Sequence, residues 1–313
     1  MKIVIFGLGS IGKKHAKVLN ENYEYEVYAF RSKGRAKPNG LNNIKQVYAW
    51  DEVKAIKPDV AFITNPTNLH VKTAIQCAHL GMHLFIEKPL SHSLDNIDML
   101  ESLCRENKLT CYTAYCLRFH PVIKKMREII VDKKIYHARI VCSSFLPAWR
   151  TEGDYRKSYS VSSLEGGGVL LDLSHEFDYT HYLFGEFIEV KGAYGRASEL
   201  TVDAEDYADI LITTAASIPV NIHLNFNSLL NERTIKVDFE DGYAEANLIT
   251  NRVEIFYRGS MDTYEYPLDR DGYLTEQSQY FFDNIGNPSI MNNLAEAKDL
   301  LVAILRFKHD KPG

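Results

Sequence analysis

The chain has 313 residues, of which 45% are hydrophobic and 25% are charged, and its formal net charge at pH 7 is −5. This length suits two domains, because single hydrophobic cores stop growing near ~250–300 residues. The acidic balance argues against nucleic acid or an anionic membrane as a partner. No apolar run approaches the ~20 residues that cross a bilayer.

Short apolar strands alternate with helical segments through residues 2–113. Such alternation predicts a parallel sheet with helices on both faces, and we assign it to a first domain, residues 1–120. The helical segments are Gly12–Asn20, His70–Leu80 and Leu94–Asn107. The expected strands are Ile3–Phe6, Glu26–Phe30, Val60–Thr64, Leu84–Glu87 and Leu109–Thr113.

The rhythm changes after Pro121, and residues 121–313 are expected to form an α+β domain with a large, mostly antiparallel sheet. Asp241-Gly242 is a hairpin turn signal between two strands. Helices are expected at Pro121–Val131, Gly168–Phe184, 274–285 and 293–307. The expected strands are Ala138–Phe145, Ile188–Tyr194, Tyr207–Thr213, Val220–Asn227, Thr234–Phe239, Tyr243–Leu248 and Val253–Tyr257.

A G-x-G-x-x-G motif follows the first strand and opens a helix. The first glycine allows a tight turn, the second lets the backbone approach a pyrophosphate, and the third permits close helix–strand packing. The start of the helix offers amide donors and a positive dipole end to the phosphates. The motif therefore predicts a Rossmann domain whose cofactor contacts include Gly7, Gly9, Ser10, Ile11 and Gly12.

The end of the second strand bears on the choice between NAD and NADP. An acidic residue that binds the ribose hydroxyls usually stands about 20 residues past the motif. Here the segment is Phe30-Arg31-Ser32-Lys33, and the nearest acid, Glu26, lies inside the strand. Arginine can pair with a 2′-phosphate, and Ser32 and Lys33 add donors. The pattern favours NADP over NAD, although solvated loop charges would also explain these residues.

Two loops follow later strands of the same sheet, at the edge where an open α/β sheet binds its ligand. The first contains Asn65, Pro66, Thr67 and His70, which we place at the cofactor. Alternatively, Asn68 caps the following helix and His70 merely starts it. The second loop is Glu87-Lys88-Pro89, whose Glu87 and Lys88 we also place at the cofactor. Its lysine could hydrogen-bond a substrate hydroxyl beside the cofactor.

A glycine run, Gly166–Gly168, precedes a helix that carries Asp172 and His175. At positions i and i+3 the two side chains would share a helix face. The carboxylate could then hold the imidazole tautomer while the other ring nitrogen takes a substrate proton. A structural His–Asp pair is the alternative, and Asp178 is assigned to structure.

Together these motifs resemble the Gfo/Idh/MocA family, which includes glucose–fructose oxidoreductase and inositol dehydrogenase. The resemblance implies a Rossmann domain followed by a domain whose open sheet commonly joins subunits into homodimers or homotetramers. It places the Glu-Lys-Pro motif on Glu87, Lys88 and Pro89, with the lysine at the substrate and the Lys-Pro bond often cis. It places the catalytic histidine on His175.

Two positions depart from the family pattern. The segment Tyr115–Pro121, with Tyr115 and Arg118, is similar to the family's cofactor-side segment, but Cys116 stands where asparagine is usual. The aspartate usually precedes the histidine by four residues, whereas Asp172 precedes His175 by three. We therefore expect Asp172 to be displaced from the usual catalytic position.

Aromatic and charged residues before the glycine run are similar to a substrate-facing loop of a branch that accompanies sugar and surface-polysaccharide biosynthesis. Stacking and charge-assisted hydrogen bonds would suit a polyhydroxylated, anionic sugar. The expected substrate contacts are Lys88, Tyr115, Trp149, Tyr155, Arg156, Tyr159, Asp172 and His175.

The sequence thus predicts an NAD(P)-dependent oxidoreductase that moves a hydride to or from a secondary alcohol of a sugar, nucleotide sugar or sugar acid. His175 would be the acid/base, Lys88 would polarise the same oxygen, and Asp172 would assist. The alternatives are an NAD-dependent glycosidase of the same family and a non-catalytic cofactor-binding regulator. Five cysteines without a C-x-x-C pair predict no metal site, and with no evident signal sequence they favour the cytoplasm.

Overall fold

The computed structural model describes residues 1–31, 41, 43–149, 154–267, 269 and 271–309. The chain divides into two compact units, each described by itself below. Unit 1 contains Met1–Cys116 and Arg270–Leu301, and unit 2 contains Leu117–Asp269 and Val302–Gly313. In the described residues we find no helix with the length and apolar character needed to span a bilayer.

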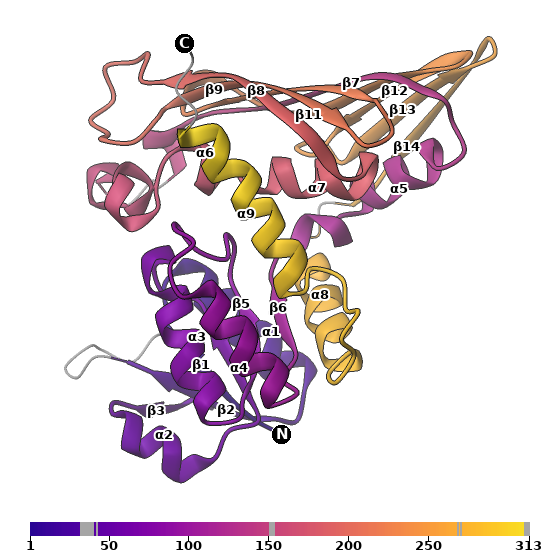
Figure 1. Ribbon diagram of the computed structural model, residues 1–313. Coiled ribbons are helices and arrows are strands. Elements are labelled where there is room, and N and C mark those ends of the chain that lie inside the picture. Colours follow the sequence, from indigo (N-terminus) through magenta and orange to yellow (C-terminus); the bar gives the residue numbers. More distant parts are fainter. Residues whose placement is uncertain (32–40, 42, 150–153, 268, 270, 310–313) are drawn as a thin grey trace. The chain divides into compact units, whose positions relative to one another are not determined.

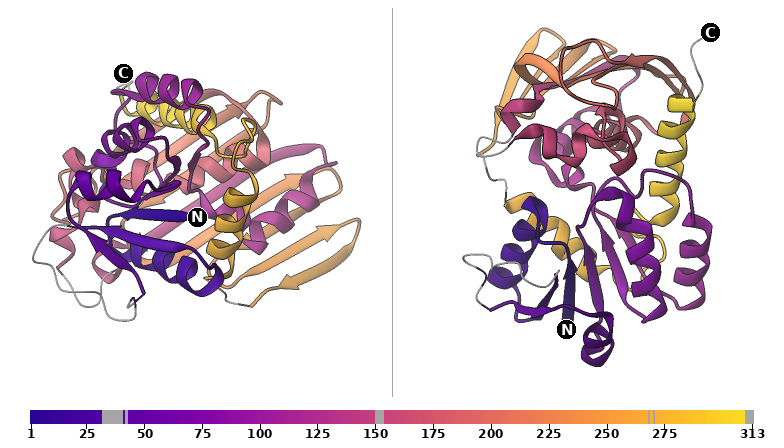
Figure 2. Two further views of the ribbon diagram at one scale, coloured as in Figure 1. Left: turned by 90° about the horizontal axis from the view of Figure 1, so that it is seen from below. Right: turned by 90° about the vertical axis from the view of Figure 1, so that its left-hand side faces the viewer.

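Unit 1 is built on a six-stranded sheet in which all neighbours are parallel, in the order β3-β2-β1-β4-β5-β6. Helices cover both faces, with α1 and α8 on one side and α3 and α4 on the other (Figures 1 and 2). The strands are β1 Lys2–Phe6, β2 Glu26–Phe30, β3 Lys45–Val47, β4 Val60–Ile63, β5 His83–Ile86 and β6 Cys111–Thr113. The helices are α1 Ser10–Asn22, α2 Trp50–Ile56, η1 Thr67–Leu69, α3 His70–His79, α4 Ile97–Glu106, η2 Cys116–Phe119 and α8 Gly272–Asp283, where η marks a 3₁₀ turn and η2 crosses into unit 2.

The core of unit 1 includes side chains from the C-terminal part of the chain. Phe281 of α8 is fully buried and packs on Phe85, with 5.4 Å between ring centroids. Gln277 donates a hydrogen bond to the Tyr112 hydroxyl at 3.0 Å. Residues 270–301 are expected in the second domain, but apolar side chains of this segment complete the core of unit 1. Helix α9, Leu294–His309, is divided between the units at Leu301.

Unit 2 is built on an eight-stranded sheet in the order β14-β13-β12-β11-β7-β10-β9-β8. All neighbours are antiparallel except β7 and β10. Helices α5 and α7 lie on one face of it (Figure 1). The helices are α5 Pro121–Ile130, η3 Leu146–Trp149, η4 Tyr155–Lys157, η5 Tyr159–Val161, η6 Ser163–Glu165, α6 Val169–Asp172 and α7 His175–Phe184. The strands are β7 Ile135–Phe145, β8 Phe187–Gly195, β9 Tyr207–Thr214, β10 Pro219–Asn225, β11 Asn227–Phe239, β12 Gly242–Asn247, β13 Arg252–Tyr257 and β14 Ser260–Glu265.

The expected fold class is confirmed, a parallel sheet followed by a mostly antiparallel one. The hairpin at Asp241-Gly242 is also confirmed, because Phe239 pairs with Gly242 across the turn and Asp241 has a φ of 66°. The single helix over Gly168–Phe184 is wrong. The chain leaves helical geometry at Leu173, so that α6 ends at Asp172 and α7 begins at His175.

Candidate active site

In the glycine turn of unit 1 the space beside Gly9 is open, whereas Gly7 and Gly12 lie tightly against other backbone atoms. A Cβ on Gly7, whose φ is 104°, would lie 2.8 Å from the backbone of Asn65, and one on Gly12 would lie 2.0 Å from the Gly7 oxygen. A Cβ on Gly9 would meet nothing within 4 Å. Helix α1 follows Gly9 with no side-chain cap and no acidic residue in its first turn. This turn therefore suits a phosphate group of a dinucleotide.

A cavity of about 440 Å³ adjoins the turn within unit 1. Its lining includes Phe30, Trp50 and Leu69 as apolar walls and Arg31 and Lys72 as cations. No Asp or Glu lines it among the described residues. The expected partners Ser32 and Lys33 lie outside the described residues. Aromatic walls with cations suit the adenosine and phosphate part of a dinucleotide. Sequence reasoning missed Lys72, although it lies three residues after Leu69 on the same helical face.

The loop after β4 lines this cavity with Asn65 and Pro66, and it is followed by a buried histidine, His70. The Asn65 side chain donates to the Thr73 hydroxyl at 2.8 Å. A 3₁₀ turn over Thr67–Leu69 leads into α3, whose first residue is His70, and no side chain caps α3. Asn68 is therefore not the cap. His70 is 1% exposed, and both of its ring nitrogens lie 2.9 Å from backbone carbonyl oxygens, so its place is internal to the loop.

Glu87-Lys88-Pro89 follows β5, and its Lys88–Pro89 peptide bond is cis. The Glu87 carboxylate, expected at the cofactor, instead lies 2.7 Å from the ring of His15 on α1 and accepts from the Lys88 amide at 3.1 Å. His15 is fully buried and has aromatic rings edge-on to it. Sequence reasoning missed His15, because a lone histidine in a helix does not reveal a partner 72 positions away.

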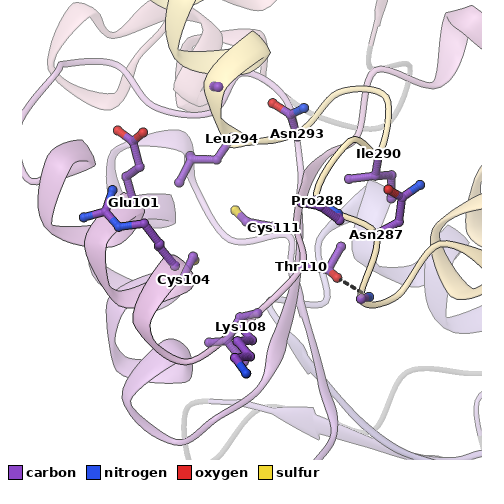
Figure 3. A pocket seen from close by; sticks show the side chains of 14 residues that line it. Glu101, Cys104, Lys108, Thr110, Cys111, Asn287, Pro288, Ile290, Asn293 and Leu294 are labelled. Atoms are coloured by element: carbon purple, nitrogen blue, oxygen red, sulfur yellow. Dashed lines mark hydrogen bonds between the residues drawn. The ribbon is translucent and has the colours of Figure 1, made fainter.

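A second cavity of unit 1, of about 480 Å³, lies at the opposite edge of the sheet, where β6 begins (Figure 3). Thr110 accepts a hydrogen bond there from the Gly286 amide at 2.7 Å. Glu101, Cys104, Lys108 and Asn287 line it, and none of the predicted site residues does. The cavity is therefore separate from the nucleotide site.

In unit 2 the glycine run ends on a buried carboxylate. Gly168 has a φ of 96°, and a Cβ there would lie 2.4 Å from the Glu205 carboxylate. Glu205 also accepts from the Leu170 amide at 3.3 Å and pairs with Lys308 at 2.9 Å. These contacts hold the start of α6, at whose other end Asp172 accepts from the Tyr159 hydroxyl at 2.8 Å.

Two ion pairs anchor α7 and thereby His175, its first residue. Glu176 is fully buried and lies 2.7 Å from Arg233 of β11. Asp178 is 1% exposed and binds Arg118 through three hydrogen bonds, the shortest 2.7 Å. Charges buried this deeply persist only when paired. The structure thus places Arg118, expected at the cofactor, in an ion pair under α7, and Asp178 in the predicted structural role.

The other expected substrate contacts are placed as follows. Trp149 donates to the Ser144 hydroxyl at 2.9 Å and keeps 42% of its surface exposed. Tyr155 accepts from the Thr201 amide at 3.2 Å. Arg156 pairs at 2.8 Å with Asp154, and that hydrogen bond lowers the pKa of the Asp154 carboxyl. Tyr115, in unit 1, is 2% exposed.

The comparisons with known proteins cover most of the chain. Residues 1–115 match a family model described as "Oxidoreductase family, NAD-binding Rossmann fold", and residues 123–245 match the "GFO/IDH/MocA C-terminal domain". The chain belongs to the Gfo/Idh/MocA family.

Relatives in this family are distant in sequence. Myo-inositol 2-dehydrogenase of Thermotoga maritima is 26% identical over 60% of this chain and 56% of its own. UDP-N-acetylglucosamine 3-dehydrogenase of Acidithiobacillus ferrooxidans is 25% identical over 83% of this chain and 78% of its own. The chain spans 56%, 57% and 65% of the lengths of the first three curated relatives.

Solved structures of similar fold cover 98% of the chain. The Acidithiobacillus enzyme superposes with a TM-score of 0.83 at 20% identity, covering 98% of this chain and 96% of that one. Levoglucosan dehydrogenase in complex with NADH and levoglucosan gives 0.82 at 16% identity over the same shares. In this Gfo/Idh/MocA protein, Lys88 belongs to unit 1 and His175 to unit 2. No cluster of three or more metal-binding side chains occurs among the described residues.

Proposed function

We propose that this protein is an NAD(P)-dependent oxidoreductase acting on a secondary alcohol of a sugar, nucleotide sugar or sugar acid. The observation that carries the proposal is the edge of the parallel sheet in unit 1. The open turn at Gly9 follows β1 and the Lys88 loop follows β5, with only β4 between these strands. A dinucleotide held at the turn would thus lie on the same edge as an ammonium group suited to a substrate hydroxyl.

In the proposed reaction the cofactor would carry the hydride and a protein side chain would carry the proton. The bound cofactor would supply a nicotinamide ring that exchanges a hydride with the substrate carbon. His175 would take the hydroxyl proton during oxidation and return it during reduction. Lys88 would donate a hydrogen bond to the same oxygen. Asp172 would act less directly, because α6 ends at this residue and its carboxylate accepts a hydrogen bond from Tyr159.

We assign NADP as the preferred cofactor. Arg31 and Lys72 both line the cavity beside the glycine turn, and no carboxylate lines it among the described residues. A 2′-phosphate would pair with these cations, whereas the ribose hydroxyls of NAD usually need an acidic partner.

We assign the substrate contacts to Lys88, Asp172 and His175, together with Tyr115, Trp149, Tyr155, Arg156 and Tyr159. The proposal extends to a homodimer or homotetramer, since the sheet of unit 2 exposes apolar side chains such as Ile188 and Leu211, 67% and 60% exposed. The cytoplasm suits its five free cysteines.

Turnover of a substrate panel tests the proposal. Myo-inositol, UDP-N-acetylglucosamine and levoglucosan would each be incubated with NAD⁺ and NADP⁺ while reduced cofactor is followed at its absorbance band. Oxidation of one alcohol, abolished in His175→Asn, is expected. Cleavage of a glycosidic bond without net cofactor reduction would replace the dehydrogenase by a glycosidase. Cofactor binding with no reaction on a broad sugar panel would point to a regulator.

A further inference from the structure

The Lys88 loop is held at both ends by histidine side chains. On one side, His15 lies 2.7 Å from the Glu87 carboxylate. On the other side, Nδ1 of His70 lies 2.9 Å from the Pro89 carbonyl oxygen. Lys88 lies between these two held residues, so the backbone that carries its side chain is anchored before and after it.

His70 also reaches the nucleotide loop. Its Nε2 lies 2.9 Å from the Asn65 carbonyl oxygen. Asn65 lines the nucleotide cavity, and its backbone is what a Cβ on Gly7 would strike at 2.8 Å. One imidazole therefore links the Lys88 loop to the loop that packs on the glycine turn. All of these residues belong to unit 1.

The chemistry of the ring suits a link between two carbonyl groups. Carbonyl oxygens only accept, so an imidazolium donates to both, whereas a neutral ring donates to one. Burial lowers the pKa of His70 and the Lys88 ammonium lowers it further, while the two backbone carbonyl contacts and the Glu87 carboxylate oppose this. The neutral ring donates to one of the two carbonyl oxygens and packs against the other. The ring is 1% exposed, which leaves water little access to compete for either carbonyl group.

We propose that His70 is a positioning residue that holds the Lys88 loop in register with the nucleotide loop. It acts through the Pro89 and Asn65 carbonyl groups and not by touching cofactor or substrate. The inference rests on the proposed function only in giving Lys88 a catalytic role. The register itself is a property of the fold, and it can be tested without turnover.

Hydrogen exchange measured by mass spectrometry tests the register. His70→Leu removes the contacts of both ring nitrogens and places an apolar side chain at this buried position, and it should speed amide exchange in residues 63–67 and 86–92. His70→Gln, whose side-chain amide carries two N–H groups, should restore part of the protection. Val71→Ala is the control, because Val71 is a buried neighbour on α3 that lacks a hydrogen-bonding side chain. Unchanged exchange in both segments of His70→Leu, or the same change in Val71→Ala, would overturn the inference.

A double-mutant cycle on turnover tests the coupling to Lys88. Misplacing a catalytic group by about 1 Å can lower kcat by about 10²-fold, and His70→Leu should approach that loss. In a Lys88→Ala background the same substitution should change kcat by less than about threefold, because no ammonium remains to be positioned. A full 10²-fold loss in both backgrounds would show a general structural role and overturn the inference. Normal turnover of Lys88→Ala alone would instead contradict the proposed function, and the exchange experiment would still decide the register.

Discussion

Two glycines of the turn after β1, Gly9 and Gly12, should respond differently when each is replaced by alanine. Gly9 has a φ of −69°, and its added Cβ would meet nothing within 4 Å. Gly9→Ala should therefore change the free energy of unfolding by less than about 1 kcal/mol. A Cβ on Gly12 would lie 2.0 Å from the Gly7 oxygen, so backbone must move. We expect Gly12→Ala to lose about 3 kcal/mol, the upper end for overpacking.

Gly9→Ala, which should leave stability nearly unchanged, should weaken cofactor binding. If a pyrophosphate approaches the backbone at Gly9, the methyl group of Gly9→Ala occupies that approach and should weaken NADP(H) by about 10- to 100-fold, or about 1.4–2.8 kcal/mol. Fluorescence titration of NADPH measures the affinity, and thermal unfolding without cofactor measures stability. A Gly9→Ala protein that binds NADPH as tightly as the parent would refute the placement of the phosphates at this turn.

Three further outcomes are expected. Arg31→Ala should weaken the binding of NADP(H) about 10- to 150-fold, the effect of losing a charged contact of ~1.5–3 kcal/mol, and should leave NAD(H) binding unchanged. Lys72→Ala should weaken NADP(H) binding by less. Equal losses of affinity for both cofactors in a titration would count against a 2′-phosphate contact. His175→Asn should lose kcat by about 10²–10⁴-fold and Asp172→Asn by less, and equal losses in steady-state kinetics would make the carboxylate part of the catalytic pair. Burial, helped by Arg233, lowers the pKa of His120 to about 4. Between about pH 6.5 and 4 the unfolded chain therefore binds a proton that the folded chain does not, and up to about 3 kcal/mol of the free energy of unfolding is lost as pH falls through that window. Urea unfolding of His120→Gln should show a free energy of unfolding that depends less on pH, and an unchanged pH dependence would contradict the assignment.

Most of the first sheet could be predicted from the sequence because β1, β4, β5 and β6 are largely continuous buried runs, while β2 alternates. All four residues of β4 are buried, as are four of the five in β1. Strand β3 could not be predicted, because only Val47 of its three residues is buried. Strand β14 escaped for a similar reason, since none of its residues is buried and no apolar alternation marks it. Helix α2 buries only Val53 and so shows no helical period.

The unit to which a C-terminal helix belongs could not be predicted from its pattern. The period of α8 shows that it has an apolar face, but Phe281 would suit any apolar core. Its placement depends on Phe85 and Tyr112, about 170–200 positions earlier in the chain. The local sequence predicts the helix but does not reveal the side chains against which it packs.

Sequence motifs point to backbone features of the candidate site, but they do not reveal side-chain pairs between residues far apart in the chain. The turn at Gly9 follows from three glycines in sequence, and its geometry agrees with the role expected of each. Glu87 and Arg118 were assigned to the cofactor by motif, yet each has a buried partner distant in the chain, His15 and Asp178. A motif names the residue that stands at a position, but the burial of its charge decides what that residue can bind.

The break between α6 and α7 gives the displaced aspartate a physical meaning. On one continuous helix, Asp172 and His175 would share a face, and a spacing of three or four would matter little. Because the helix ends at Asp172 and a new one starts at His175, the two side chains are set by separate anchors. Tyr159 holds the carboxylate, while the ion pairs of Glu176 and Asp178 hold the helix that carries the imidazole. Removing the Tyr159 hydroxyl should therefore disturb Asp172 without moving His175, a separation that a shared helix would not allow.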